Sequence, residues 1–215
     1  MDQTLSKGDT KIEKKESESI RIFCLLYLES KSKCYLFKFH FFQIYMGDFQ
    51  YDTIFILTVD GVHFRTHESR KNPSSKKYSH KFHGPGLSYE IAIAINEDRV
   101  VSIKGPEDAS QADITTFRDS LIHEIPEGKR GIGDSGYKGE PTKLSFHRPN
   151  HSKDMTNYIN RARARHENFN ARIKNYNILS NCFRSNEKAK HQMAFEAVCI
   201  LVQYDMENGR PLMEM

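Results

Sequence analysis

The chain has 215 residues, 38% of them hydrophobic and 28% charged, and its net charge of +4 is only mildly basic. This composition fits a soluble globular protein with one sizeable core. The four cysteines form no CxxC pair, so neither a zinc knuckle nor a disulfide scaffold is indicated. The longest uncharged run near the N-terminus, residues 22–28, is far shorter than the roughly 20 apolar residues of a membrane span.

Residues 1–52 differ from the rest of the chain. They begin with a Lys- and Glu-rich stretch that cannot be a secretory signal, and they continue with two apolar-aromatic patches that lack turn and cap signals. We therefore expect an atypical N-terminal extension over residues 1–52, one folded domain over residues 53–205 and a C-terminal tail over residues 206–215. An intracellular, soluble protein without a membrane partner is expected.

Strands dominate the first part of the folded domain. Residues 53–61 form an apolar, β-branched run that ends on Asp60 and Gly61, and residues 62–66 alternate apolar and polar side chains. Residues 88–95 and 99–105 are predicted to pair as a hairpin.

A helix and a short strand are predicted next. Asp113 is a suitable N-cap for a helix that continues to residue 124. Residues 129–134 form a short strand that ends at Asp134. Two long helices are predicted over residues 154–176 and 187–204, and the whole order indicates an α/β domain built in layers.

The motif GDSGY at residues 133–137 looks like the nucleophile loop of a chymotrypsin-like protease. Tyr137 stands where that loop needs a second glycine, and the following chain is basic and helical. Ser135 is therefore expected to be a polar turn residue. The pair His166 and Glu167 begins an HExxH zinc motif, but residue 170 is Asn, which excludes a zincin, and His166 is predicted to pack in the core.

The first long helix is predicted to have an apolar stripe beside a polar face. At 100° per residue, the stripe contains Met155, Tyr158, Ile159, Ala162, His166, Phe169, Ile173 and Tyr176. Arg163, Glu167, Asn170 and Lys174 lie together on the neighbouring face. This arrangement predicts that Glu167 is a carboxylate held close to the buried side of a rigid helix.

Three carboxylates are placed to converge: Asp60 and Asp134 at strand ends, and Glu167 on the helix. Three carboxylates this close repel one another unless a hard divalent metal lies between them. Two Mg²⁺ ions held there would activate a water or a hydroxyl and stabilise the leaving oxygen in phosphodiester cleavage. Each residue also has a simpler explanation, because Asp before Gly is a common turn former and Glu167 could pair with Arg163 or Lys174 at helical spacing.

Basic residues gather on both sides of these carboxylates. Residues 62–83 contain six Lys or Arg against one Glu, and residues 161–190 contain eight against two. Such clusters favour contact with a phosphate backbone, although they could also be ordinary solvated faces. The residues expected to contact DNA are Arg65, Lys76, Lys77, Lys81, Arg163, Arg165, Asn170 and Lys174.

Five segments in order resemble the DDE superfamily of transposase-derived endonucleases, of the PIF/Harbinger-like kind found in eukaryotes. They are VDG at 59–61, YSHKFHGPGLSYEIAIAI at 78–95, GP and DITTFR between 105 and 118, GDSGYKG at 133–139, and RARARHENFNARIKNYNIL at 161–179. The resemblance covers roughly residues 53–212. It implies an RNase H-like mixed sheet flanked by helices, with Asp60, Asp134 and Glu167 as catalytic residues that bind two Mg²⁺ or Mn²⁺ ions.

The resemblance also implies a nuclear protein that cleaves DNA and transfers strands. Residues 1–52 contain no recognisable helix-turn-helix, so a separate DNA-binding protein and a second copy of the chain are further candidate partners. The spacing of 33 residues from Asp134 to Glu167 is short for Harbinger-type members, which leaves the subfamily open. Two alternatives are a catalytically silent, domesticated or decayed DNA-binding protein, and an RNase H-like nuclease that acts on RNA or a hybrid.

Overall fold

The structure is a computed structural model and describes residues 54–68, 73–185 and 187–215. The predicted N-terminal extension over residues 1–52 lies outside the described residues. Among the helices of these three ranges, none is long and apolar enough to cross a membrane.

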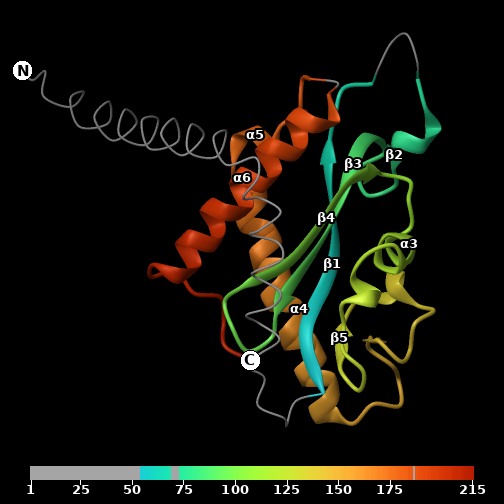
Figure 1. Cartoon of the computed structure of the whole chain (residues 1–215), viewed down its shortest axis with the longest axis vertical. Coiled ribbons are helices and arrows are strands. Elements are labelled where there is room, and N and C mark those ends of the chain that lie inside the picture. Colours follow the sequence, from blue (N-terminus) through green and yellow to red (C-terminus); the bar gives the residue numbers. More distant parts are fainter. Residues whose placement is uncertain (1–53, 69–72, 186) are drawn as a thin grey trace, which may run out of the picture. The chain divides into compact units, whose positions relative to one another are not determined.

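A mixed sheet forms the centre of the domain (Figure 1). Its strands are β1 (Phe55–Arg65), β2 (Tyr78–Ser79), β3 (Gly84–Ala94), β4 (Val100–Asp108), β5 (Arg130–Ile132) and β6 (Leu144–Ser145). The order across the sheet is β2-β3-β1-β5-β6, and β4 also pairs with β3. The β3–β4 hairpin is antiparallel, as predicted, and β1 pairs antiparallel with β3 and parallel with β5.

Strand β1 is longer than predicted, because residues 53–61 and 62–66 are parts of one element. Asp60 therefore lies in the middle of β1, opposite Ile91 of β3, and not at a strand end. Strand β5 pairs with β1 only as far as Thr58. Between Thr58 and Arg65 the β5 side of β1 has no paired strand among the described residues, and Phe183 forms an isolated bridge at Thr66. Asp60 lies in this open stretch and lines a pocket.

The described helices are α3 (Asp113–Arg118), α4 (Lys153–Lys174), α5 (Asn177–Ser180) and α6 (Lys188–Glu207), with short 3-10 turns η1 (Ser75–Lys77), η2 (Leu121–His123) and η3 (Ser135–Tyr137). Helix α4 begins after Ser152, whose side chain accepts a hydrogen bond from the Met155 N–H at 3.2 Å. The predicted apolar stripe is confirmed, because Ile159, Phe169 and Ile173 are fully buried. The periodic pattern thus sets the orientation of α4 on the sheet.

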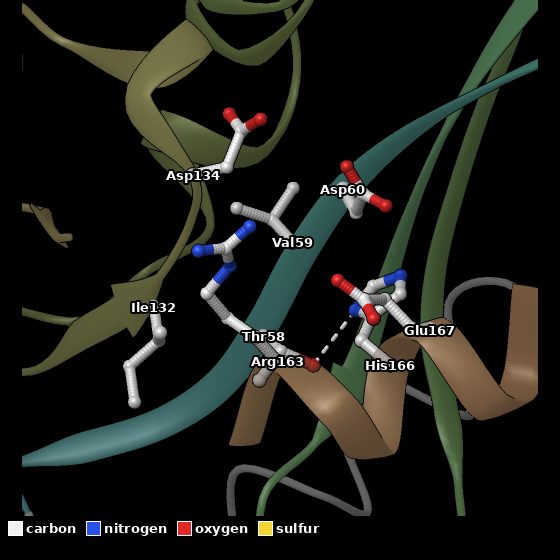
Figure 2. A pocket seen from close by; sticks show the side chains of 8 residues that line it. All are labelled: Thr58, Val59, Asp60, Ile132, Asp134, Arg163, His166 and Glu167. Atoms are coloured by element: carbon white, nitrogen blue, oxygen red, sulfur yellow. Dashed lines mark hydrogen bonds between the residues drawn. The ribbon is translucent and has the colours of Figure 1, made fainter. Parts of the chain in front are cut away.

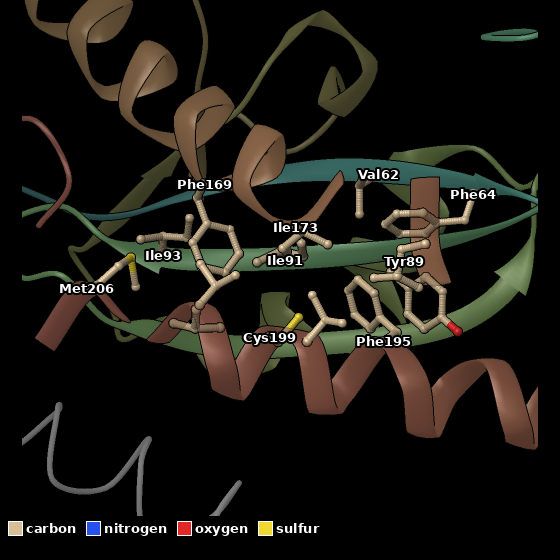
Figure 3. Close-up of a cluster of buried hydrophobic side chains, with 14 of the residues drawn as sticks. Val62, Phe64, Tyr89, Ile91, Ile93, Phe169, Ile173, Phe195, Cys199 and Met206 are labelled. Carbon is tan, nitrogen blue, oxygen red and sulfur yellow. The ribbon is translucent and has the colours of Figure 1, made fainter. Parts of the chain in front are cut away.

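Helices α4 and α6 share one core with β1 and β3 (Figure 3). The side chains that meet there are Val62, Phe64, Tyr89, Ile91, Ile93, Phe169, Ile173, Phe195, Cys199 and Met206. Full burial of one such side chain contributes about 1.5–3 kcal/mol, so this layer holds α4 firmly against β1. On the other face of β1, Phe117 of α3 and Leu121 of η2 are buried, and the Phe117 ring packs edge-on against Tyr137.

The architecture is α/β with a mixed, RNase H-like sheet flanked by helices, as predicted. Residues 206–215 contact the domain. Helix α6 continues to Glu207, Leu212 is buried, and the backbone carbonyls of Pro211 and Met213 accept hydrogen bonds from arginines of α4.

Candidate active site

One pocket brings the three predicted carboxylates together (Figure 2). Asp60 comes from the middle of β1, Asp134 from the turn after β5, and Glu167 from α4. The remaining lining residues are Thr58, Val59, Ile132, Arg163 and His166. The parallel pairing of β1 with β5 places Asp134 beside Asp60, and the α4 core places Glu167 beside both.

Asp60 is held by two hydrogen bonds. Its Oδ1 accepts from the Gly61 N–H at 2.8 Å, and its Oδ2 accepts from Asn170 Nδ2 at 2.8 Å. Burial raises the pKa of Asp60 to about 6; nearby Lys81 opposes this shift, and Asp134 adds to it. At neutral pH this carboxylate is ionised, at a cost in free energy that a cation would offset.

Asp134 and Glu167 are more accessible. Asp134 caps η3, with Oδ1 accepting from the Gly136 N–H at 2.7 Å. Glu167 is exposed, and no hydrogen bond or ion pair joins its carboxylate to another residue in the described ranges. The simple alternative of an ion pair with Arg163 or Lys174 is therefore not observed in this structure.

His166 lies between this pocket and the core. It is buried, and its Nδ1 is 2.8 Å from Thr58 Oγ1. Burial lowers the pKa of His166 to about 3, so the ring is neutral at physiological pH. The prediction that this histidine packs in the core is confirmed.

Two residues predicted to contact DNA have structural roles instead. Arg165 is 5% exposed, and its guanidinium donates to Asp98 Oδ1 at 2.5 Å and to the carbonyls of Ala94, Glu97 and Met213. Asn170 is 7% exposed and orients Asp60. Both side chains are turned into the fold, so the DNA contact predicted for them lacks the exposure that it would need.

The other predicted DNA contacts are accessible at least in part. Arg65, Lys76, Lys81 and Lys174 are exposed, and Lys77 and Arg163 are half-buried. Lys81 Nζ donates to the Gly61 carbonyl at 2.6 Å, which brings the basic segment before β3 to the residue next to Asp60. In Figure 2 the Arg163 side chain extends from α4 toward the Asp134 side of the pocket. The positively charged Lys81 and Arg163 thus lie beside the pocket of the three carboxylates.

Asp113 is a further carboxylate close to Asp60 and Asp134. It was predicted to be a helix N-cap, but the N-cap is Ala112, and no side-chain cap bond forms. Burial raises the pKa of Asp113; Lys81 opposes this shift, and Asp134 adds to it. Asp113 is therefore a fourth carboxylate near the pocket.

The donor set fits a hard divalent cation, because carboxylate oxygens are the ligands that Mg²⁺ and Mn²⁺ prefer. Within the described part of the chain, no three Asp, Glu, His or Cys side chains are close enough to hold one ion. The side chains must therefore move toward one another to share an ion.

Comparison with known proteins identifies the family. Residues 59–203 match the family described as DDE superfamily endonuclease, and the match includes Asp60, Asp134 and Glu167. No curated protein and no solved structure matches the chain. Because the matched segment covers more than half of the sequence, the chain belongs to the DDE superfamily endonuclease family.

Proposed function

We propose that this domain is a divalent-metal-dependent DNA endonuclease of the transposase type, with Asp60, Asp134 and Glu167 as its catalytic residues. The main support is that these three carboxylates, which come from distant parts of the sequence, line one pocket. Lys81 and Arg163 lie beside them, and a polyanionic substrate would also contact these two cations. The PIF/Harbinger-like subtype and a nuclear location belong to the same proposal and rest on the sequence resemblance.

Different residues would orient the carboxylates, bind the ions and contact the DNA. Asn170 and the Gly61 N–H hold Asp60 in one orientation, and the Gly136 N–H holds Asp134. Two Mg²⁺ or Mn²⁺ ions, when bound by the three carboxylates, would supply charge stabilisation and water activation for phosphodiester hydrolysis. Arg65, Lys76, Lys77, Lys81, Arg163 and Lys174 would contact the DNA phosphates, and strand transfer would use a DNA 3′-hydroxyl in place of water.

Calorimetric titration with Mn²⁺ tests the proposal. Wild type is expected to bind, and Asp60→Asn, Asp134→Asn and Glu167→Gln are each expected to weaken binding. Asp154→Asn, an exposed carboxylate at the start of α4, is the matched control and should bind like wild type. A nicking assay on supercoiled DNA should then show activity only in proteins that bind the ion.

The second candidate is a catalytically silent DNA-binding protein with the same fold. It is favoured by one observation, that no three acidic or histidine side chains in the described ranges are near enough to share an ion. A wild-type protein that binds DNA but no Mn²⁺ would support this candidate and refute the endonuclease.

A further inference from the structure

Helix α6 carries apolar side chains on two opposite faces. One face, with Phe195, Cys199 and Met206, packs into the core against the sheet (Figure 3). On the other face, Met193 is 40% exposed and Tyr204 is 65% exposed. A surface helix usually presents polar side chains on the face turned away from the core. The second apolar face of α6 therefore needs an explanation.

The outward side chains of α6 repeat every seven residues. They form two interleaved series, which are Lys190, Ala197 and Tyr204, and Met193, Ile200 and Glu207. Because the steps between the series alternate between three and four residues, all six lie on one stripe of the helix. We name these six residues the outer stripe of α6. Ala197 and Ile200 at its middle are half-buried, and the other four are exposed.

The outer stripe is complementary to itself in the antiparallel direction. When two helices with this repeat pack antiparallel, each residue of one series faces a residue of the other series. A two-fold axis between residues 198 and 199 places Lys190 opposite Glu207, Met193 opposite Tyr204, and Ala197 opposite Ile200. The pairs combine opposite charges, a thioether with an aromatic ring, and a small side chain with a large one. In a parallel pair, by contrast, like charges would meet at both ends.

The charged ends of the stripe can take a partner from a second copy. Lys190 Nζ is 2.7 Å from Glu187 Oε1, but both side chains are at least 60% exposed, and such a pair within one helix contributes little. Glu207 Oε1 accepts from Gln203 Nε2 at 2.7 Å, which leaves further lone pairs on the carboxylate. Antiparallel packing also brings the positive N-terminal end of each helix beside the negative C-terminal end of the other.

We propose that two copies of this chain associate through the outer stripe of α6, packed antiparallel about a two-fold axis. The symmetry places each matched pair in the interface twice. None of the six stripe residues is among those that line the pocket of Asp60, Asp134 and Glu167, so the proposal is independent of the proposed function. One helix from each copy makes a small interface, and we therefore expect a dimer that forms at micromolar concentrations.

Sedimentation equilibrium of the full chain measures this association, over roughly 1–200 µM because the interface is small. The mass of wild type is expected to rise toward twice the 25.0 kDa of one chain. Tyr204→Ala is expected to weaken the dimer by about tenfold or more, because it removes an exposed aromatic side chain from two places in the interface. Lys153→Glu, at an exposed position at the start of α4, is the control and should associate like wild type.

Charge reversal at the two ends tests the antiparallel register. Lys190→Glu and Glu207→Lys should each weaken the dimer by about tenfold or more, because each brings like charges together at both symmetric positions. An equimolar mixture of these two variants should associate as tightly as wild type. In the mixed dimer every reversed residue meets an opposite charge from the other chain, and a loss of folding in either variant could not be repaired in this way.

Three results would each refute the proposal. The first is a wild-type chain that stays monomeric at every concentration. The second is a dimer that Tyr204→Ala or the single charge reversals do not weaken, because it would use another surface. The third is a mixture of the two charge-reversed variants that associates no better than either alone. Thermal melts identify any variant that fails to fold.

Discussion

Replacement of Asp60 with Asn is expected to stabilise the metal-free protein at neutral pH. Asp60 is a largely buried carboxylate whose pKa is raised from 3.8 to about 6. The folded protein thus keeps a proton on Asp60 up to about pH 6, whereas the unfolded chain releases it near pH 3.8. The free energy of unfolding therefore falls as the pH rises from 3.8 through 6, and it stays at the lower level above pH 6.

The size of this effect follows from the width of the pH window. Each pH unit between the two pKa values corresponds to about 1.4 kcal/mol, so the ionised carboxylate lowers stability by up to about 3 kcal/mol. An amide avoids this penalty and can keep both hydrogen bonds. Asn170 Oδ1 is buried without a partner among the described residues, so a flip of the Asn170 amide would let it accept from the side-chain amide introduced by Asp60→Asn.

Urea unfolding in EDTA, from pH 4 to pH 8, measures the difference. Asp60→Asn should exceed wild type by about 1–3 kcal/mol at pH 8, and the difference should vanish near pH 4. Asp119→Asn, which is exposed, should differ from wild type by less than about 0.5 kcal/mol. If Asp60→Asn is less stable than wild type at pH 8, or if the difference does not depend on pH, burial does not raise the pKa of Asp60 as the structure indicates.

Three further substitutions test other parts of the structure, and a fourth, Lys76→Met, is a control. Arg165→Met should lower the free energy of unfolding by roughly 2–4 kcal/mol in urea titrations, because it removes a buried guanidinium and four hydrogen bonds, and it should leave DNA affinity per folded molecule unchanged. Lys81→Met should reduce the slope of log DNA affinity against log salt concentration by about 1, and it should tighten Mn²⁺ binding because it removes a positive charge beside Asp60. The control Lys76→Met should change the slope alone. Equal Mn²⁺ affinities of the two variants would contradict the position of Lys81. His166→Gln should flatten the loss of stability below pH 6.5, because the unfolded chain takes up a proton there that the buried ring, with its pKa near 3, refuses; a slope identical to wild type between pH 6 and 4 would contradict this.

Much of the fold could be predicted because it depends on local periodicity. The apolar stripe of α4 follows from a spacing of three and four residues, and the β3–β4 hairpin follows from two β-branched runs around a polar turn. The boundary inside β1 was wrong, since Asp60 and Gly61 look like a turn. Pairing of nine successive residues with β3 overrides that local preference.

The roles of the residues around the site were harder to predict. A helical wheel shows which residues of α4 share a face, but it does not show what lies opposite that face. Asn170 is 110 residues from its partner Asp60, and Arg165 bonds to the β3–β4 turn and to the C-terminal tail. Both partnerships depend on packing of distant segments.

The element types, the three candidate carboxylates and the likeness to the endonuclease family all follow from the amino-acid sequence, because periodicity and ordered motifs are local properties of the chain. Packing of distant segments decides that Arg165 and Asn170 of α4 turn into the fold. It also decides that Asp113 approaches Asp134 and does not cap its own helix. A carboxylate's environment is set by whatever lies within a few ångströms of it. For Asp113 those neighbours include two glycines, a lysine and an aspartate from other segments.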